Sequence, residues 1–541
     1  MLSRYKRERP ILGGNILYIN GQQLSIQDIE VAIQAKTAFV LDPTAKQSML
    51  QSYEWVQQVT HNTNKPVYGV NTGFGSLARV SIPPEQSALL STNLIRSHAA
   101  GVGPIADEAT TRIVMLLRAN ALAKGVSGCR PLLVEMLLDM LNKNLIPQIP
   151  MQGSCGSSGD LAPLAHLGLV LIGDPMGYAK FNGEIFGADK ALQRAGIVPL
   201  TLQAKDGLAI TNGAQLSTAI AALNLIAGKR LVKVAEVAAA MSMEALLGIS
   251  RAFHPEVHKM RPYLGARQCA HNIMTLLKGS QFIDSVPEKL QDAYSLRCTP
   301  QVLGSVRDML RFVEQQVSIE INAATDNPLI LLHVDDDSQG DATNKAFSAG
   351  MFHGEPIGMA MDSFKIAISE LANLSERRLY RLTTGNLSQL LPPGLVGKDC
   401  PAVGMIVPQT TAAALVSENK ALAWPASVDS IPTCEDQEDH IAMSTVAARR
   451  ARDVLHNSTR VVAIELLSAA TALEFRLEEH PQRSLGDGVS KALHNVQITL
   501  AKLPNHSTIG DKIECLTTAI ENGSILQDLP SLLDVGDLLN E

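Results

Sequence analysis

The sequence predicts a mostly α-helical protein, built as a bundle of long helices with a small mixed part at its N-terminus. Three segments rich in Ala, Leu, Ile and Met contain almost no helix-breaking residues: Ala214–Leu247, Pro356–Leu382 and Ile441–Glu474. Their composition favours helices, and their apolar faces are too wide for helices exposed to solvent. Hydrophobic residues make up 46% of the chain and aromatic residues only 4%, so we expect an aliphatic core. Such helices bury their faces in a bundle, with neighbouring subunits covering what one chain leaves open.

The shorter elements follow from local patterns along the chain. Gly14–Ile26 is β-tending and predicts a small hairpin around Asn20-Gly21. Thr110–Lys124 has apolar residues at helical spacing and stops at a glycine, which predicts a helix. Leu132–Leu145 predicts a second amphipathic helix, ended by the prolines that follow it.

Composition along the chain predicts three parts. Residues 1–213 form an N-terminal part, residues 214–480 contain the long-helix bundle, and residues 481–541 form a more polar helical layer. The polar stretch Asp335–Asn344 is the clearest insertion, and we expect it to be a surface loop without chemistry.

The charge of the chain bears on its partners. A net charge of −7 provides no basic footprint for nucleic acid or for an anionic membrane. Basic residues near the start of the chain are followed by no apolar run, which argues against a secretion signal. The longest uncharged stretch, Gly207–Gly228, could span a membrane by length, but its polar side chains favour a buried helix start. We therefore expect neither nucleic acid nor a membrane as partner.

Cysteine and histidine spacing gives no metal signal. The seven cysteines include no CxxC pair, so neither a disulfide framework nor a zinc ribbon is predicted, and a reduced cytoplasm fits best. His254 and His258 have a spacing that metals favour, but Pro255 lies between them and no third ligand is evident. No Gly-rich loop opens a helix after a strand, so no nucleotide site is predicted.

The segment Gly153–Pro163 permits unusual chemistry. In a Ser-Gly pair the Gly amide nitrogen can close onto the carbonyl two residues earlier, because only Gly tolerates the required backbone angles without a side-chain penalty. Loss of water from that carbonyl and from the Ser158 hydroxyl would leave a five-membered ring with an exocyclic methylidene group. Such an electrophile otherwise requires a bound cofactor. From composition alone, a plain Gly/Ser-rich connection between helices is the commoner outcome.

A helix is predicted directly after this segment. Asp160 stands where it can cap that helix, and Pro163 suits its first turn. The positive end of the helix would then point at Ser158 and favour electron flow towards it.

The run Gly156–His166, GSSGDLAPLAH, closely resembles the fingerprint of the aromatic amino acid lyase family. That family includes histidine, phenylalanine and tyrosine ammonia-lyases and 2,3-aminomutases, and the likeness runs from about Gly14 into the last helices. The resemblance implies an ammonia-lyase-like, mostly α homotetramer whose active sites are shared between subunits. It also implies a 4-methylideneimidazol-5-one electrophile formed from Ser157, Ser158 and Gly159, with no external cofactor.

The same resemblance assigns roles to other residues. Tyr68, in a Gly-rich segment taken to be a mobile loop, matches the family's catalytic base; a Tyr with an ordinary pKa near ~10 needs nearby positive dipoles or cations for that task. Tyr294 is implied to assist at the electrophile, and Arg297 to clamp the substrate carboxylate with two parallel hydrogen bonds. The remaining matches are substrate-binding positions: Gln291, Asn212 and the aromatic wall Phe352.

Two positions bear on the substrate. His98 resembles the histidine that faces the substrate ring in histidine ammonia-lyases, to which the likeness is closest. Glu438 stands where phenylalanine- and tyrosine-acting relatives carry an amide, and a carboxylate can accept a hydrogen bond from imidazole. Together they favour elimination of ammonia from L-histidine, giving urocanate.

Three departures from the family pattern leave alternatives open. Ser157 stands where most relatives have Ala, Met351 replaces a common Asn, and Trp424 occupies a place where histidine-acting relatives commonly show His. A lyase or 2,3-aminomutase acting on phenylalanine or tyrosine is the alternative enzyme. A non-catalytic helical assembly protein, which has kept the fold and lost the chemistry, is the alternative of another class, and retention of Tyr68, Tyr294 and Arg297 argues against it.

Overall fold

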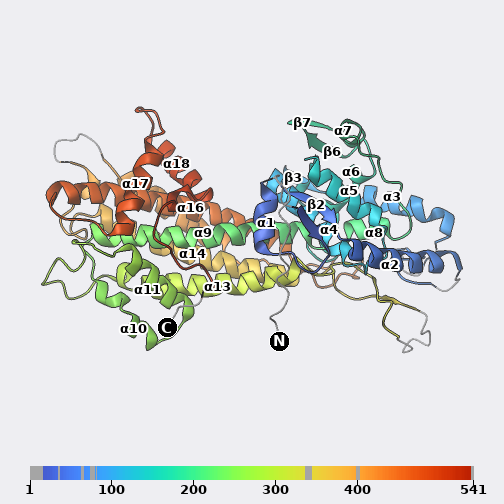
Figure 1. Ribbon diagram of the computed structural model, residues 1–541, viewed down its shortest axis with the longest axis horizontal. Coiled ribbons are helices and arrows are strands. Elements are labelled where there is room, and N and C mark those ends of the chain that lie inside the picture. Colours follow the sequence, from blue (N-terminus) through green and yellow to red (C-terminus); the bar gives the residue numbers. More distant parts are fainter. Residues whose placement is uncertain are drawn as a thin grey trace. The chain divides into compact units, whose positions relative to one another are not determined.

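The structure of the chain, a computed structural model, shows helices throughout the described part (Figure 1), which confirms the predicted mostly α class. The described residues are 16–34, 37–62, 66–73, 80, 82–335, 344–397 and 403–537. Two compact units divide the chain: one comprises residues 1–223, 316–359 and 425–449, and the other comprises 224–315, 360–424 and 450–541. The three-part division expected from composition stays a prediction.

The first unit is built mainly on short helices around a buried pair. Helix α4 has almost no exposed side chain and packs against α5, so the two helices predicted in this region are confirmed. Helices α3, α6 and α8 pack against one another beside that pair. The helices of this unit are α1 (Ile26–Ile33), α2 (Pro43–Asn62), α3 (Ser87–His98), α4 (Glu108–Ala123), α5 (Pro131–Asn142), α6 (Leu161–Leu171), α7 (Ala188–Ala195) and α8 (Asp206–Thr211).

Small sheets make up the mixed part of the first unit. Strands β1 (Ile16–Ile19) and β2 (Ala38–Leu41) form a parallel pair. Two antiparallel pairs are formed by β3 (Val102–Ile105) with β5 (Pro150–Gln152) and by β8 (Leu329–Ile330) with β9 (Ala346–Phe347). An antiparallel three-stranded sheet has the order β4 (Ile146–Pro147), β6 (Tyr178–Phe181), β7 (Glu184–Gly187).

The hairpin predicted over Gly14–Ile26 is wrong. The turn at Asn20-Gly21 exists, but the chain then enters α1, whose first residues are held by a capping box between Ser25 and Asp28. Strand β1 consequently pairs with β2, which follows that helix, and the pairing is parallel. The Asn-Gly signal marked a turn correctly, but the capping box that begins four residues after Gly21 starts a helix where a second strand was expected.

The second unit contains most of the long helices. The predicted long segments appear as α9 (Gln215–Ala245), α14 (Glu355–Thr383) and α16 (Ser444–Glu479), and the boundaries between units fall inside these helices and α13. Its other helices are α10 (Pro255–Lys259), α11 (Leu264–Leu276), α12 (Tyr294–Arg297), α13 (Thr299–Glu320), α15 (Ile406–Leu422), α17 (Asp487–Leu500) and α18 (Ile509–Glu521). Short 3-10 helices lie at Pro84–Gln86, Ser250–Phe253, Pro393–Leu395 and Ser524–Leu526.

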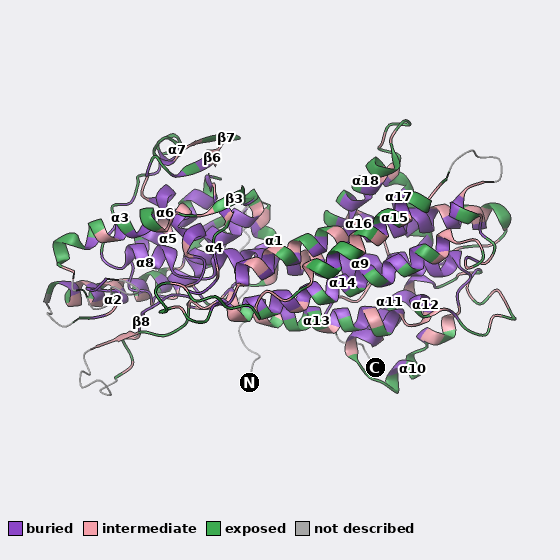
Figure 2. Ribbon diagram, turned by 180° about the vertical axis from the view of Figure 1, so that it is seen from behind, coloured by how far each residue is buried: buried purple, intermediate pink, exposed green. Residues whose placement is uncertain are grey.

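A single carboxylate joins three of the long helices. Glu465 of α16 accepts hydrogen bonds from Ser242 of α9 (2.8 Å) and from Ser375 of α14 (2.6 Å). Arg378 of α14 forms a bidentate ion pair with the same carboxylate, with Nε 2.6 Å from Oε1 and Nη2 2.8 Å from Oε2. Arg378 and Glu465 have no exposed surface, and Figure 2 shows the long helices mostly in the colour of buried residues. Because a buried charge is tolerated only when paired, this contact fixes how the three helices pack.

Two further observations concern the described ranges only. None of their helices combines the length and the hydropathy needed to cross a bilayer, and Gly207–Gly228 instead forms α8 and the buried start of α9. None of their His, Cys, Asp and Glu side chains gather in a group of three that could hold a metal ion.

Candidate active site

One cavity of the first unit brings together seven residues that the sequence singles out. It encloses about 790 Å³, and its lining includes Tyr68, His98, Ser157, Ser158, Asn212, Phe352 and Glu438. They come from stretches of chain far apart in sequence, so the fold alone assembles them.

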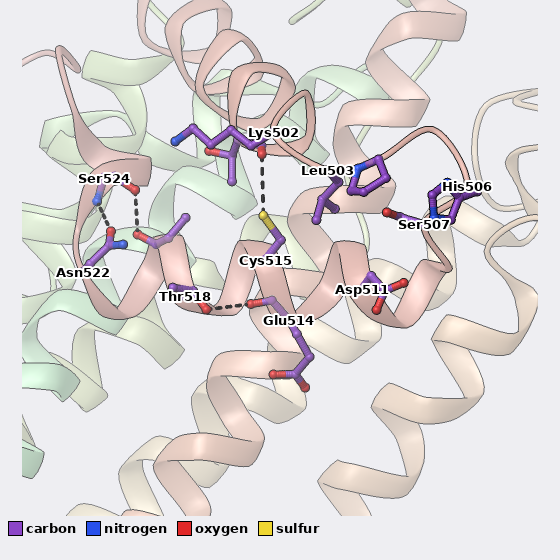
Figure 3. Close-up of a pocket in the computed structure, with 13 residues that line it drawn as sticks. Lys502, Leu503, His506, Ser507, Asp511, Glu514, Cys515, Thr518, Asn522 and Ser524 are labelled. Carbon is purple, nitrogen blue, oxygen red and sulfur yellow. Dashed lines mark hydrogen bonds between the residues drawn. The ribbon is translucent and has the colours of Figure 1, made fainter. Parts of the chain in front are cut away.

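A second cavity, of about 630 Å³, lies along α17 and α18 of the second unit (Figure 3). None of the predicted site residues lines it. Its acidic groups serve local contacts, because Asp511 caps the start of α18 and Glu514 pairs with Arg460 at 2.7 Å. The cavity of the first unit is therefore the candidate active site.

The Ser-Ser-Gly segment is held in a shape that only glycine permits at its last position. Gly159 has a φ of +73°, and a Cβ atom there would meet the carbonyl carbon and oxygen of Gly213 at 2.3 Å. The next amide, of Asp160, donates to the Gly213 carbonyl at 2.7 Å. The chain around Gly159 thus lies directly against the segment before α9, and any side chain at this position would force the two apart.

Asp160 stands at the start of α6 as predicted, but it does not cap that helix through its side chain. Its carboxylate instead accepts from the amide (2.8 Å) and hydroxyl (3.0 Å) of Ser217, the third residue of α9. The hydroxyls of Ser154 (2.7 Å) and Thr445 also donate to it. The prediction that the Asp160 side chain caps α6 is therefore wrong. Its carboxylate lies near the N-terminus of α9 instead, where the helix dipole also favours a negative charge. Pro163 does lie in the first turn of α6.

We expect Asp160→Ala to lower the free energy of unfolding by about 3 kcal/mol, because it leaves a buried amide and buried hydroxyls without their acceptor. Asp160 has no exposed surface, so water cannot replace the lost contacts. The measurement is the urea midpoint of unfolding. Ser217→Ala removes one donor and keeps the amide contact, so it is expected to cost only about 1 kcal/mol. Equal midpoints for the two variants would contradict this account of the segment.

Glu438 is the polar centre of the cavity. Its Oε1 accepts from the Ser158 hydroxyl at 2.5 Å, and its Oε2 accepts from the hydroxyls of Ser157 at 2.6 Å and Thr433 at 2.9 Å. Partial burial acts to raise the pKa of Glu438, but hydrogen bonds from these three hydroxyls and from Cys434 bring that pKa below its usual value. Glu438 is therefore a carboxylate at neutral pH, directly beside Ser157 and Ser158.

His98, the last residue of α3, lines the same cavity. Burial lowers the pKa of its imidazole, although the Leu94 carbonyl and the charge of Glu438 act in the opposite direction. The ring is therefore neutral at physiological pH, and its Nδ1 lies 3.0 Å from the Ser97 hydroxyl. A neutral imidazole can donate from one nitrogen and accept at the other, which suits contact with a second imidazole.

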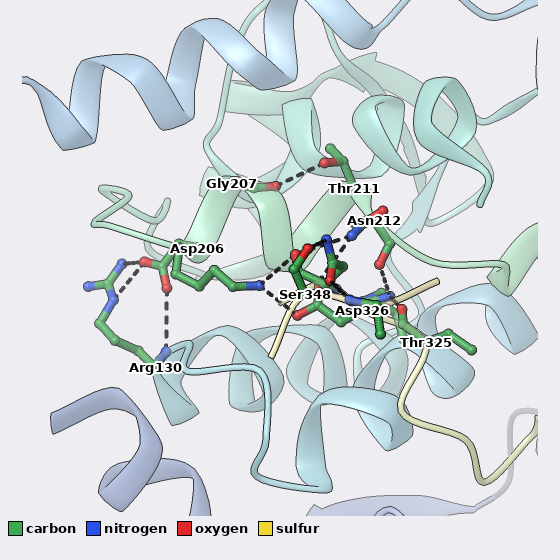
Figure 4. A network of polar contacts seen from close by, with 12 residues as sticks. Arg130, Asp206, Gly207, Thr211, Asn212, Thr325, Asp326 and Ser348 are labelled. Carbon is green, nitrogen blue, oxygen red and sulfur yellow. Dashed lines mark hydrogen bonds and ion pairs between the residues drawn. The ribbon is translucent and has the colours of Figure 1, made fainter. Parts of the chain in front are cut away.

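Asn212 contacts the Ser-Ser-Gly segment through its side-chain amide. In the orientation that satisfies both ends, Nδ2 donates to the Ser158 carbonyl at 2.8 Å and Oδ1 accepts from the Asn327 amide at 3.0 Å. A buried polar network fixes this region (Figure 4). In it, Lys205 Nζ bonds Asp326 at 2.9 Å and the Asn327 carbonyl at 3.3 Å. Since these groups are almost fully buried, the network holds Asn212 rigidly.

Tyr68 reaches the cavity from a tight turn. Val67 and Val70 on either side of it are buried in a cluster with Val56 and Ile330, and Gly69 has a φ of +69°. The Val67 amide also donates to the Asn71 side chain at 2.6 Å. The backbone of the turn is thus anchored. Phe74 and Gly75, the end of the predicted mobile loop, lie outside the described residues, as does most of the Asp335–Asn344 insertion.

Gln291, Tyr294 and Arg297 belong to the second unit and do not line this cavity. Tyr294 is 71% exposed, with the Arg297 guanidinium 4.8 Å from its ring centre, and Gln291 is also exposed. Within that unit the segment is firmly held, because Asp292 pairs with Lys289 at 2.6 Å and accepts from the Ile249 amide at 2.7 Å.

Two of the positions that depart from the family pattern lie outside the lining of the cavity, and two residues that the sequence did not single out bind Glu438. Met351 is 47% exposed next to Phe352, and Trp424 is 78% exposed in the second unit; neither lines the cavity. Sequence reasoning missed Thr433 and Cys434, whose side chains bind Glu438. No motif marks them, and only their positions, five and four residues before Glu438, could have suggested a turn that closes on it.

Comparison with known proteins agrees with this geometry. The aromatic amino acid lyase family matches residues 24–497. Histidine ammonia-lyase from Caldanaerobacter subterraneus subsp. tengcongensis is 48% identical over 459 residues, covering 85% of this chain and 88% of that protein. Among solved structures, histidine ammonia-lyase from Trypanosoma cruzi has a TM-score of 0.85 at 33% identity, covering 97% of this chain and 99% of the other. Tyrosine aminomutase from Streptomyces globisporus has a TM-score of 0.86 at 32% identity, covering 94% and 98%.

The family match extends over well more than half of the chain, and the described structure has the helical architecture of these relatives. The chain therefore belongs to the aromatic amino acid lyase family.

Proposed function

We propose that this chain is a histidine ammonia-lyase, which eliminates ammonia from L-histidine and releases urocanate. One observation carries the proposal: the Glu438 carboxylate bonds Ser158 at 2.5 Å in a cavity that His98 also lines. An acceptor beside the electrophile-forming segment suits a substrate whose ring carries N–H groups. A phenyl ring offers no such donor, so Oε1 of an ionised Glu438 would face it without a partner once ring formation has removed the Ser158 hydroxyl.

The residues fit the family's internal electrophile. Its formation requires the Gly159 nitrogen to bond the Ser157 carbonyl carbon, with one water lost from that carbonyl and one from the Ser158 hydroxyl. The positive φ of Gly159 and its close approach to Gly213 support such a closure, because no side chain could occupy that position. Once formed, the group supplies an electron-accepting centre that eases departure of the amine.

The other residues are assigned by what they can do. Tyr68 takes a proton from the β-carbon of the substrate, Asn212 holds the Ser158 carbonyl, and Phe352 forms an apolar wall. His98 and Glu438 orient the imidazole between them. Arg297 clamps the substrate carboxylate, with Gln291 and Tyr294 beside it, and these three are supplied by another subunit.

The test is incubation of the purified protein with L-histidine, L-phenylalanine and L-tyrosine separately. The expected product is urocanate with one equivalent of ammonia. Cinnamate or coumarate without urocanate would eliminate the proposal.

The second candidate is a related lyase or a 2,3-aminomutase acting on another aromatic amino acid. Two observations support this candidate: the structural likeness to a tyrosine aminomutase at 32% identity, and the departures from the family pattern at Met351 and Trp424. The same incubations separate it, because an aminomutase would return the ammonia to the β-carbon and yield a β-amino acid.

We also propose a homotetramer with shared active sites, working in the cytoplasm. The cavity contains a base and an electrophile-forming segment, but none of the described residues that line it is a Lys or Arg that could bind the substrate carboxylate. Arg297 is the cation that the family pattern supplies, and its Nε is buried without a hydrogen-bond partner among the described residues. A subunit that offers Arg297 to a neighbour's cavity would complete both sites.

Mixing two inactive variants tests this sharing. Tyr68→Phe disables the first unit and Arg297→Met disables the second, so each homotetramer alone is expected to be nearly inactive. Co-expressed in equal amounts, they are expected to recover about one quarter of wild-type activity, because that fraction of sites draws both intact units from different subunits. Activity no higher than that of the separate variants would contradict sharing.

A further inference from the structure

Ser157 departs from the family pattern and contacts Glu438 directly. Most relatives have Ala at this position, which carries no hydroxyl. Here Ser157 is 92% buried, and its hydroxyl donates to Oε2 of Glu438 at 2.6 Å. The Thr433 hydroxyl donates to the same oxygen at 2.9 Å. The other oxygen, Oε1, is bonded by Ser158 at 2.5 Å. The two carboxylate oxygens therefore have different sets of partners.

Ring formation changes only one of these sets. The Ser158 hydroxyl oxygen leaves as water, so Oε1 loses the donor that occupies it in the uncyclised chain. The hydroxyls of Ser157 and Thr433 take no part in that water loss and remain on Oε2. The chemistry that creates the electrophile thus also frees one particular oxygen of Glu438.

Glu438 lies at the end of an exposed turn with an unusual backbone conformation. Thr433 and Glu438 form a two-way backbone bridge, with N–O distances of 3.0 and 3.3 Å, across an exposed turn. Inside the turn Cys434, Glu435 and Asp436 all have positive φ, between 50° and 63°. Non-glycine residues adopt this region only when surrounding contacts over-determine it. The bond to Ser157, which comes from a different part of the chain, is such a contact.

We infer that Ser157 is a positioning residue: its hydroxyl, together with Thr433, holds Oε2 of Glu438 so that Oε1 is left to accept the imidazole N–H of the substrate. The inference rests on the proposed histidine-lyase function. It assigns Ser157 a role in ring recognition that is separate from its role in forming the electrophile. With Ala at 157, Glu438 keeps its charge but loses the anchor outside its own turn, and its carboxylate samples orientations that miss the ring.

The test compares Ser157→Ala with wild type and with Ser157→Thr, which keeps a hydroxyl. All three are expected to lose two waters by intact mass, because Ala is the usual residue of the family's ring. For Ser157→Ala the KM for L-histidine is expected to rise about tenfold, with kcat changed by less than about threefold. Ser157→Thr is expected to restore the KM to within about threefold of wild type.

Binding without turnover gives a second readout. In a Ser158→Ala background no ring forms, and the Ser158 hydroxyl is absent as it is after cyclisation. Titration calorimetry with L-histidine is expected to show about tenfold weaker binding when Ser157→Ala is added to this background. When Glu438→Gln is present as well, adding Ser157→Ala is expected to change binding by less than about twofold, because the carboxylate it positions is gone.

Two outcomes would overturn the inference while leaving the proposed function intact: an unchanged KM and affinity in Ser157→Ala, or an equal loss with and without Glu438. Failure of the proposed function has a different signature. In that case wild type itself would release no urocanate from L-histidine, or would keep the full sequence mass.

Discussion

Ser158→Ala is expected to lower the turnover of L-histidine by about 10⁴-fold or more, the loss typical when an enzyme's covalent centre is removed. The substitution deletes one hydroxyl, and without it the segment has no methylidene group to offer. The Ser158 side chain is only partly buried and, among the described residues, its hydroxyl bonds Glu438 alone, so the fold is expected to persist. Intact mass is the direct measurement: wild type should fall short of its sequence mass by two waters, whereas the variant should show no such deficit.

The control for Ser158→Ala is Ser305→Ala, an exposed serine on α13. It removes a hydroxyl that bonds only the Gln301 carbonyl of its own helix, at 2.8 Å, and is expected to leave turnover unchanged. Gel filtration of both variants checks that assembly is retained. Full activity in Ser158→Ala would show that the electrophile assignment is wrong, and with it the mechanism.

Tyr68→Phe is expected to lower kcat by about 10³-fold, within the range for loss of a general base. The change removes only the hydroxyl, while the turn around it stays fixed by Val67, Val70 and Asn71. Ring formation does not require this hydroxyl, so the variant is expected to lose two waters like wild type. A variant that loses two waters but has a much lower kcat would show that the Tyr68 hydroxyl acts on the substrate and is not needed to form the electrophile.

Tyr53→Phe is the matched control for Tyr68→Phe. Tyr53 lies in the same unit, and its hydroxyl donates to the Gln203 side chain outside the lining of the cavity. Its replacement is expected to leave kcat within about twofold of wild type, since it touches nothing that reacts. A Tyr68→Phe variant that keeps a tenth or more of wild-type activity would exclude Tyr68 as the base.

Much of the fold is readable from local sequence. The three long helices carry runs with almost no helix-breaking residues, whose composition already favours their conformation, and burial then follows because their apolar faces are wide. The hairpin prediction failed because an Asn-Gly pair defines a turn but not the partner of the strand that precedes it. Strand β1 pairs with residues beyond a helix, and nothing local encodes that choice.

The site shows the same division. Motifs located Ser158, Tyr68 and Asn212 because each sits in a distinctive run of residues, and the structure brings them to one cavity. The true partners of Asp160 could not be predicted, since Ser217 and Thr445 are 57 and 285 residues away and are ordinary hydroxyl residues. Pairwise contacts across such distances are set by packing, which a reading of single segments does not contain.

The reach of the Asp160 contacts also orders events in time. Thr445 is synthesised 285 residues after Asp160, so the segment cannot acquire its full set of bonds until that much more of the chain has been made. If the proposed ring closes only in a segment held by these contacts, the reactive group forms after distant parts of the chain have met. The two missing waters would then serve as a permanent mark of each molecule that has completed folding.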